Sequence, residues 1–485
     1  MGMRESPPRS EQTAGQAASA AEGPGVFTRL RRAILAVVAV ALLGGLLIWL
    51  GSQSDRQRQG EWTANPQEPP PLDPAAVLGM SPELPTTAEA FNQEAFKICG
   101  RLTRDMPHRP EAYAVAAFIF NRHGRTADAA DVWRKALQVN ARFSPAYLGL
   151  GTVATKKGDY QEAVPLLREA IELDPAVEQA YRLLVDALLH QDQAEEALTV
   201  ARQYTSRFPR SADSHYRVGR GHSELGQYKE AKQSGEEAVR LDPNFTQAYF
   251  LLAAVCVRLG ESDLARVHRE KFAQLKEQDA EADRKQKKAY QDLSTQQTLA
   301  ASYYLAAGRV YADFGDPRKA EAHWLRGAAI APALTECRGA LISFYLQANR
   351  PAAAVRQLDE LTAAAPENPV HWIQRGRLQA ELGQLEASEA SYRQAVKIAP
   401  DQVSGYAGLI ELALHYQRPM PDAAALAEKA ANLAPSAQAY LQLSAVRDRQ
   451  GDRPGAIAAA KRAVELEPRD MRVHAAYDQL LRDPR

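Results

Sequence analysis

Apolar residues recur at helical spacing in residues 146–175, which read AYLGLGTVATKKGDYQEAVPLLREAIELDP. One set of three, spaced by three or four positions, falls on one face of a helix: Tyr147, Leu150 and Ala154. Gly158 interrupts this pattern, and a second helical face follows it: Ala163, Leu167 and Ala170. Pro175 then ends the second helix. The segment therefore predicts a helix–turn–helix unit.

Prolines repeat this unit with a period of 34 residues or twice that, and only Pro435 falls one residue late. The members in register are Pro107, Pro175, Pro209 and Pro243, then Pro332, Pro366, Pro400 and Pro468. By this register, ten units begin at Pro110, Ser144, Glu178, Ala212, Thr246, Ala301, Thr335, Pro369, Val403 and Ala437. A half-unit helix is expected near Ala88–Arg104, and another near Met471–Leu481.

The register is interrupted once, between Thr246 and Ala301, where the spacing is 55 residues and 21 are therefore inserted. The insertion contains KEQDAEADRKQKKAYQDLS, with acidic residues first and basic residues after them. Glu281 with Lys285, and Asp283 with Lys287, are spaced to pair on one helix face. We expect a charged, solvent-exposed helical insertion (273–300) that joins two solenoid blocks, 86–272 and 301–485, as a hinge or spur.

The N-terminal region has a different pattern. Residues 1–27 have no period and are expected to be disordered. Residues 28–52 are predicted to form a transmembrane helix, because Ala33–Leu50 holds eighteen residues without a charge. A cleaved signal peptide and a buried core helix are the alternatives. Arg29, Arg31 and Arg32 precede the span, which favours a cytoplasmic N-terminus and an exported body on a bacterial inner membrane. Residues 53–85 read as a proline-rich linker.

The repeated unit resembles the tetratricopeptide repeat, a 34-residue helix–turn–helix family. One unit carries its pattern at Tyr147, Leu150, Gly151, Gly158, Ala163, Ala170 and Pro175, and another at Trp372, Gly376, Gly383, Tyr392, Ala395 and Pro400. The resemblance implies an all-α, right-handed superhelical solenoid with a concave surface. Arg338 and Arg269 stand where the family has aromatic residues, so we expect altered packing at both places.

Composition restricts the function. Lys+Arg and Asp+Glu number 59 each, so the net charge is zero, which argues against a broadly basic nucleic-acid binder. Only 7% of residues are aromatic, as expected where helices pack closely through small side chains. The three cysteines, Cys99, Cys256 and Cys337, form no CxxC pair and no disulfide scaffold.

Catalytic motifs are missing from the sequence: it has no HExxH, GxSxG or Walker lysine. His215 and His222 share a helix face and would need a third ligand to hold a metal, but His215 stands in an aromatic packing position of its unit. GRGHSELG, from Gly219 to Gly226, lacks the spacing of a phosphate loop, and its glycines are repeat positions. We therefore expect no catalytic residue, metal or cofactor, and no small-molecule substrate.

The resemblance implies that residues five, nine and thirteen of each unit face the concave groove. These positions hold Phe118, Arg182, Asp186, Tyr216, Arg220, Phe250, Arg258, Arg309, Ile373 and Arg377. Arginine and aromatic side chains dominate the energetics of interfaces, and forked arginines suit acidic groups. We expect an extended, acidic peptide or protein segment as partner. The carboxylate clamp of some relatives is absent, because Ala114, Phe118, Leu148 and Thr152 occupy its places.

These observations predict a membrane-anchored scaffold for protein–protein or protein–peptide interaction, with no enzymatic activity. Two alternatives remain open at this stage. One is an assembly factor for an envelope process, such as cytochrome maturation, pilus formation or outer-membrane biogenesis. The other is an accessory subunit of an enzyme.

Overall fold

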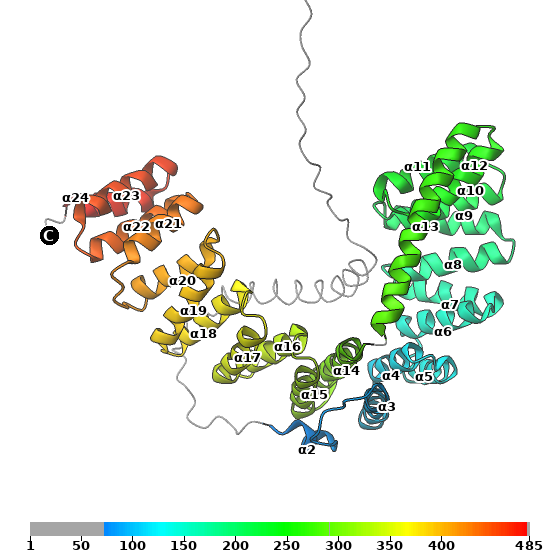
Figure 1. Cartoon of the computed structure of the whole chain (residues 1–485), viewed down its shortest axis with the longest axis horizontal. Helices are drawn as coiled ribbons and strands as arrows, with labels where there is room; N and C mark the ends of the chain where they lie inside the picture. Colours follow the sequence, from blue (N-terminus) through cyan, green and yellow to red (C-terminus); the bar gives the residue numbers. More distant parts are fainter. Residues whose placement is uncertain (1–71, 291, 483–485) are drawn as a thin grey trace, which may run out of the picture.

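The computed structural model describes residues 72–290 and 292–482, and within these residues it contains helices and no strand. The helices pair into hairpins, and the hairpins stack side by side along an open arc (Figure 1). We call the part from α3 to α13 arm 1 and the part from α14 to α24 arm 2. The all-helical repeat architecture predicted from the sequence is confirmed.

Arm 1 follows the short helix α2 (Pro74–Leu78) and comprises α3 (Ala88–Asp105), α4 (Pro110–Arg122), α5 (Thr126–Val139), α6 (Ser144–Lys157), α7 (Tyr160–Leu173), α8 (Glu178–His190), α9 (Ala194–Arg207), α10 (Ala212–Glu224), α11 (Tyr228–Leu241), α12 (Thr246–Arg258) and α13 (Ser262–Tyr290). Arm 2 comprises α14 (Leu293–Phe314), α15 (Pro317–Ile330), α16 (Thr335–Gln347), α17 (Pro351–Ala364), α18 (Pro369–Glu381), α19 (Leu385–Ile398), α20 (Val403–Leu414), α21 (Ala423–Leu433), α22 (Ala437–Arg449), α23 (Arg453–Leu466) and α24 (Met471–Arg482). From α4 to α23, each even-numbered helix is the first of a pair. Nine of the ten predicted unit starts are the first residue of such a helix, and the tenth, Ala301, lies inside α14.

The turn inside a unit shows why the pattern has a glycine followed by a small polar residue. Gly158 ends α6 in the left-handed region, with φ of 78°, where a residue without a Cβ has no steric penalty. Asp159 then begins α7, and its carboxylate accepts a hydrogen bond from the main-chain N–H of Glu162 at 3.0 Å. One helix therefore stops and the next starts within two residues.

The fourth residue of many units forms a hydrogen bond with the main-chain carbonyl six residues earlier, just after the preceding helix ends. The pairs are Tyr113 with Pro107, Tyr147 with Ala141, His215 with Pro209, Tyr249 with Pro243, Trp372 with Pro366, Tyr406 with Pro400 and His474 with Pro468, at 2.9 to 3.2 Å. An imidazole can make this contact as a phenol or an indole does. His215 is therefore a structural residue, as its repeat position suggested.

Arg338 occupies the same fourth position, where the sequence suggested altered packing. Its guanidinium is buried, and Nη1 donates a hydrogen bond to the carbonyl of Ala328 at 3.0 Å, near the end of the preceding helix. Nη2 also lies 3.5 Å from the carboxylate of Glu360. The arginine thus performs the same role as the aromatic residue, by binding a carbonyl at the end of a helix.

The two arms do not join in sequence order. α14 packs against α3 and α4, at the N-terminal end of arm 1, and α15 packs against α2. Among the helices described, α13 contacts only α12 and α14. Since α3 is the second helix of a half unit, α14 takes the place of the first helix that this half unit lacks. The segment from α2 to α4 consequently lies near the middle of the arc, whereas α12 and α24 lie at its two tips (Figure 1).

The long helix α13 makes this order possible. It has 29 residues, so it spans about 43 Å and returns the chain from the tip of arm 1 toward the middle of the arc. Glu281 and Lys285 form the expected pair on it, at 2.7 Å. The inserted residues of the repeat register lie on α13 and on the first turns of α14.

A polar outer face explains why no further hairpin stacks on α13. At the equivalent place in the preceding unit, Gly235 is buried, and a Cβ there would lie 2.9 Å from Leu252 of the next first helix. Thirty-four residues later stands Arg269, which is exposed on α13, and Arg266 nearby is exposed as well. Burying two arginines without partners is strongly unfavourable, so this face remains in water. Arg269 therefore marks the end of a stack.

The junction between the arms has a continuous apolar core. Helix α3 contributes Phe91, Ile98 and Leu102, and these side chains belong to the same buried cluster as Tyr304 and Trp324 of arm 2. Residues about 200 positions apart in the sequence are thus held together by ordinary burial of apolar surface.

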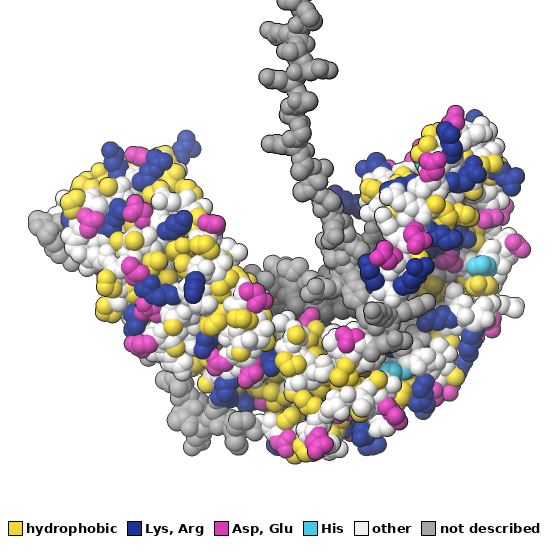
Figure 2. Space-filling view, viewed as in Figure 1, with side chains coloured by type: hydrophobic (Ala, Val, Ile, Leu, Met, Phe, Trp, Pro, Cys, Tyr) yellow, Lys and Arg dark blue, Asp and Glu magenta, His cyan; other side chains and the backbone are white. Residues whose placement is uncertain are grey.

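The first helices form the inner layer of the arc. Consecutive first helices contact one another from α12 through α10, α8, α6 and α4 to α14 and α16, and again from α18 to α24. Second helices of consecutive units make no such contacts among the residues described. In a curved stack the layer with the closer spacing is the concave one, so the first helices line the hollow that is visible between the arms (Figure 2).

One prediction requires correction. No helix in 72–290 or 292–482 is both long enough and apolar enough to cross a membrane. Most of these helices have 11 to 14 residues and span about 20 Å, which is shorter than a hydrocarbon core of about 30 Å. This finding overturns the predicted single-pass membrane localisation. The segment on which the prediction depended, Ala33–Leu50, lies outside the described residues, as do the predicted disordered tail and most of the linker.

Candidate functional site

The structure places the predicted groove residues on the inner layer of first helices. Those with exposed side chains are Phe118, Arg182, Phe250, Arg258 and Arg377. Those that are partly buried are Asp186, Tyr216, Arg220, Arg309 and Ile373. Phe118 and Phe250 are 55% and 59% exposed, which is unusual for phenylalanine. The exposed residues occur on five first helices, so they form a row along the concave surface rather than one compact cluster.

In arm 1, part of this row is already paired. Asp186 of α8 accepts a hydrogen bond from Nη1 of Arg220 on α10 at 2.6 Å, and it also binds Arg217. Arg217 is buried and lies 3.3 Å from Asp213 as well. Burial alone would lower the pKa of Arg217, but Asp213 and Asp186 raise it above its usual value. The sequence rule missed Arg217, because the residue stands at a core position of its unit.

This pairing changes the charge available in the groove. Asp186 and Arg220 bind each other, so they stabilise the contact between α8 and α10 rather than presenting opposite charges to a ligand. By contrast, Arg182, Arg258 and Arg309 form no ion pair with any described residue. Arg182 and Arg258 are exposed, and they remain the available cations of arm 1.

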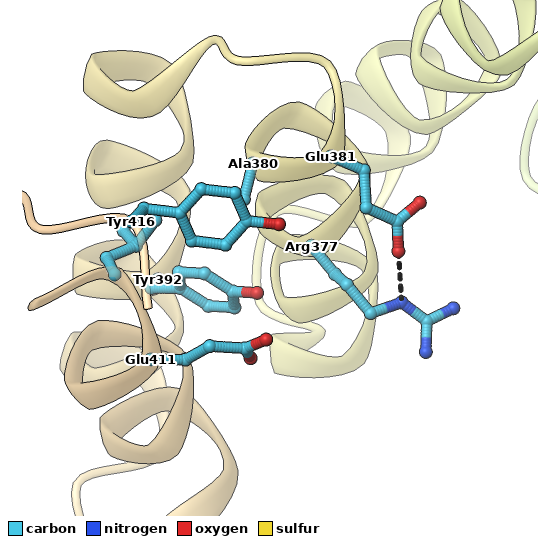
Figure 3. A pocket seen from close by; sticks show the side chains of 8 residues that line it. Arg377, Ala380, Glu381, Tyr392, Glu411 and Tyr416 are labelled. Atoms are coloured by element: carbon cyan, nitrogen blue, oxygen red, sulfur yellow. Dashed lines mark ion pairs between the residues drawn. The ribbon is translucent and has the colours of Figure 1, made fainter. Parts of the chain in front are cut away.

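In arm 2, the row contains a pocket of about 190 Å³ between α18 and α20. Its lining residues are Arg377, Ala380, Glu381, Tyr392, Gly408, Glu411, Leu412 and Tyr416. Arg377 and Glu411 both stand at position nine of their units, on neighbouring first helices. Figure 3 shows the side chains of Tyr392, Tyr416 and Glu411 directed from one side toward Arg377 and Glu381 on the other.

Two glycines allow the ring of Tyr392 to reach this pocket from the second helix α19. A Cβ at Gly408 would lie 2.2 Å from the ring, and a Cβ at Gly376 would lie 3.0 Å from it. The ring therefore fits between α18 and α20 only because both helices carry a glycine there. Tyr392 is 3% exposed, and its hydroxyl forms no hydrogen bond with any described residue.

Charge in the pocket is unevenly balanced. Nε of Arg377 lies 3.8 Å from Oε1 of Glu381, which is a loose ion pair (Figure 3). Glu411 is exposed and has no ion pair within the described part of the chain. Burial raises the pKa of Glu381, the Arg377 charge lowers it, and the Glu411 charge raises it further. Burial also raises the pKa of Tyr392 and of Tyr416, and Glu411 adds to both shifts.

Groups suited to a metal ion do not occur in the described residues, where no cluster of three or more His, Cys, Asp or Glu side chains has the required geometry. Cys99, Cys256 and Cys337 are buried free thiols. Burial raises the pKa of Cys99 and Cys337 to about 12, which disfavours the reactive thiolate. The chemistry of the concave surface is therefore that of hydrogen bonds, ion pairs and aromatic contact.

Sequence models of the tetratricopeptide repeat match this chain over residues 119–178, 154–217, 212–245, 246–271, 301–326 and 342–403. A curated relative, Protein STIP1 homolog from Dictyostelium discoideum, is 32% identical over 108 residues. That match covers 22% of this chain and 19% of the relative, so the chain spans about a fifth of the relative's length.

Among solved structures, MamA 41-end from Desulfovibrio magneticus RS-1 is similar with 22% identity and a TM-score of 0.33, over 35% of this chain and 96% of that one. YrrB, described as a TPR protein with an unusual peptide-binding site, is similar with 18% identity and a TM-score of 0.32, over 39% of this chain and 93% of that one. The matching sequence models and the helix pairs that they cover agree with the 34-residue register. The chain therefore contains tetratricopeptide repeats.

Proposed function

We propose that this chain is a scaffold that binds a segment of another protein along its inner layer of first helices. One observation carries the proposal: arginine and aromatic side chains at groove positions are exposed, although their sequence neighbours are buried in the helix stack. Phe118 at 55% exposure lies between Ala117 and Ile119, which are both fully buried. Exposed aromatic residues of this kind are typical of binding surfaces.

Binding on this surface requires no covalent step. The helices are held by their own core, so a partner segment meets a surface that is already formed, and little conformational entropy is lost by the scaffold. An extended segment suits a long concave surface because successive side chains can contact successive first helices. In arm 1 we assign Arg182 and Arg258 to acidic groups of the partner, since both guanidinium groups are exposed and without a carboxylate.

Site-specific photo-crosslinking tests the proposal. A photoreactive phenylalanine analogue is placed at Phe118 or Phe250 on first helices, and at Leu466 on the second helix α23 as a control with 38% exposure. We expect one and the same protein to be captured at both groove positions and not at position 466, with partners identified by mass spectrometry. Equal capture at all three positions would contradict groove binding.

The contribution of charge is tested with the captured partner. Arg182→Glu combined with Arg258→Glu should weaken its binding at least tenfold, because two attractive contacts become repulsive. Arg202→Glu is the matched control, since Arg202 is an exposed arginine on the second helix α9 and should leave the affinity unchanged. Helical content measured by circular dichroism should be the same in all three proteins.

A further inference from the structure

The pocket between α18 and α20 differs in charge from the exposed arginines of arm 1. We infer that it receives the cationic side chain of a lysine or arginine in the partner segment, which it holds between Glu381, Glu411 and the rings of Tyr392 and Tyr416. This inference rests on the proposed function, because it specifies one contact of the segment that the groove binds.

The first step of the argument is the charge count. Glu381 and Glu411 bring two negative charges to the pocket, and Arg377 brings one positive charge. The loose contact of 3.8 Å between Arg377 and Glu381 leaves the Glu411 carboxylate without a cation among the described residues. One ammonium or guanidinium group would make the pocket neutral, whereas a carboxylate from the partner would raise its negative charge to two.

The second step is the unused hydroxyl of Tyr392. This side chain is almost completely buried, yet its hydroxyl has no hydrogen-bond partner in the described residues and lines the pocket (Figure 3). A buried polar group without a partner is unfavourable, so the site favours a ligand that can supply the contact. An ammonium group has donors for the phenol oxygen and for the carboxylates at the same time.

The third step is the shape of the pocket. Its volume of about 190 Å³ is smaller than the range of about 300–1,000 Å³ usual for drug-sized ligands, and it corresponds to about six water molecules at about 30 Å³ each. This space suits one long side chain rather than a cofactor. The two tyrosine rings provide aromatic faces, which attract organic cations by about 0.5–2 kcal/mol.

The elevated pKa of Glu381 agrees with this argument. Burial is its largest cause, and the neighbouring Glu411 acts in the same direction. A cation bound between the two carboxylates would oppose both effects. The pocket is thus arranged so that a positive ligand charge relieves an existing electrostatic cost.

Random dodecapeptides displayed on phage, selected on the full chain, provide the test. We expect the bound peptides to share a lysine or arginine, and replacement of that residue by uncharged norleucine to weaken binding at least tenfold. Glu381→Gln combined with Glu411→Gln should weaken the charged peptide at least tenfold and leave the norleucine peptide unchanged. Glu367→Gln is the matched control, because Glu367 is an exposed glutamate in the loop before α18.

The outcomes separate the two proposals. If the selected peptides bind through Phe118 and Phe250 but are insensitive to the double glutamine variant, the pocket inference fails and the groove function stands. Selection of acidic peptides that depend on Arg377 would also overturn the pocket inference. If no peptide is selected and groove crosslinking captures nothing, both proposals are wrong.

Discussion

The junction between the arms and the pocket of arm 2 use the same three residue types in opposite ways. At the junction, Arg326 donates to Glu94 at 2.5 Å, and the Tyr304 hydroxyl donates to the other oxygen of Glu94 at 2.6 Å. In the pocket, Arg377 and Glu381 are 3.8 Å apart, and the hydroxyl of Tyr392 has no partner among the described residues. The side chain of Arg326 is 2% exposed, whereas that of Arg377 is 45% exposed.

The difference separates a polar group that holds the fold from one that is available for binding. At the junction Arg326 also donates to the carbonyl of Glu83 at 2.8 Å, so the guanidinium connects three segments of the chain. Such a network is stable only when its members are paired, because each unpaired charge would remain buried. In the pocket, the same residue types keep bonding capacity and access to solvent, which are the requirements for a ligand.

The largest expected effect is the loss of the buried carboxylate at the junction. Glu94→Ala should reduce the free energy of unfolding by about 3–5 kcal/mol, because Arg326 is then buried without its counter-charge. Glu381→Ala should cost less than about 1 kcal/mol, since its ion pair is loose and partly exposed. Urea unfolding followed by circular dichroism measures both.

A second variant distinguishes loss of the network from loss of packing. Glu94→Leu combined with Arg326→Met removes both charges and fills the space with apolar atoms, so it should recover most of the stability lost in Glu94→Ala. If Glu94→Ala and Glu381→Ala cost the same, the junction network does not differ from the pocket in the way described here.

The next effect concerns pH. His323 of α15 is fully buried beside Tyr311, its Nδ1 lies 2.7 Å from the carbonyl of Lys319, and its Nε2 has no hydrogen-bond partner among the described residues. Burial, assisted by the charges of Arg101 and Lys319, lowers its pKa to about 3, while the nearby Asp105 opposes the shift. The unfolded chain therefore binds a proton at His323 at a higher pH than the folded chain does.

It follows that the stability due to neutral His323 is complete above about pH 6.5 and is lost progressively as the pH falls toward 3. Between pH 7 and pH 5 the loss should be about 2 kcal/mol. His323→Phe keeps an aromatic ring beside Tyr311 and should reduce the pH dependence, whatever its own stability is. Urea midpoints at the two pH values provide the measurement, and an unchanged pH dependence in the variant would refute the assignment.

Much of the fold follows from the 34-residue register, but the order of the arms does not. The register places the helix starts because local signals such as Gly158 and the fourth-position donors act within one unit. The contact of α14 with α3 is different, because it joins segments about 200 residues apart and depends on which exposed faces fit together. The exposed Arg269 on α13 was visible in the sequence as a departure, but its meaning as the end of a stack required the structure.

The pocket was predictable only in part. Arg377 was selected because arginine at position nine is typical of an interface, and Glu411 stands at position nine of the next unit but is not of that type. Tyr392 occupies a packing position of its unit, and only the adjacent Gly376 and Gly408 let its hydroxyl reach the groove. A rule based on residue type at fixed positions therefore finds one wall of the pocket and misses the other.

The smallest expected effect gives the sharpest comparison, because it removes one hydroxyl from each site. Tyr304→Phe should cost about 1.5–3 kcal/mol, since the hydroxyl binds the charged Glu94. Tyr392→Phe should change the free energy of unfolding by less than about 0.5 kcal/mol, because its hydroxyl has no partner to lose, yet it should weaken the lysine-containing peptide several-fold. Urea unfolding and fluorescence anisotropy of the labelled peptide measure the two quantities. A Tyr392→Phe variant that is as destabilised as Tyr304→Phe would show that the hydroxyl supports the helix stack, and the distinction between the two sites would then be lost.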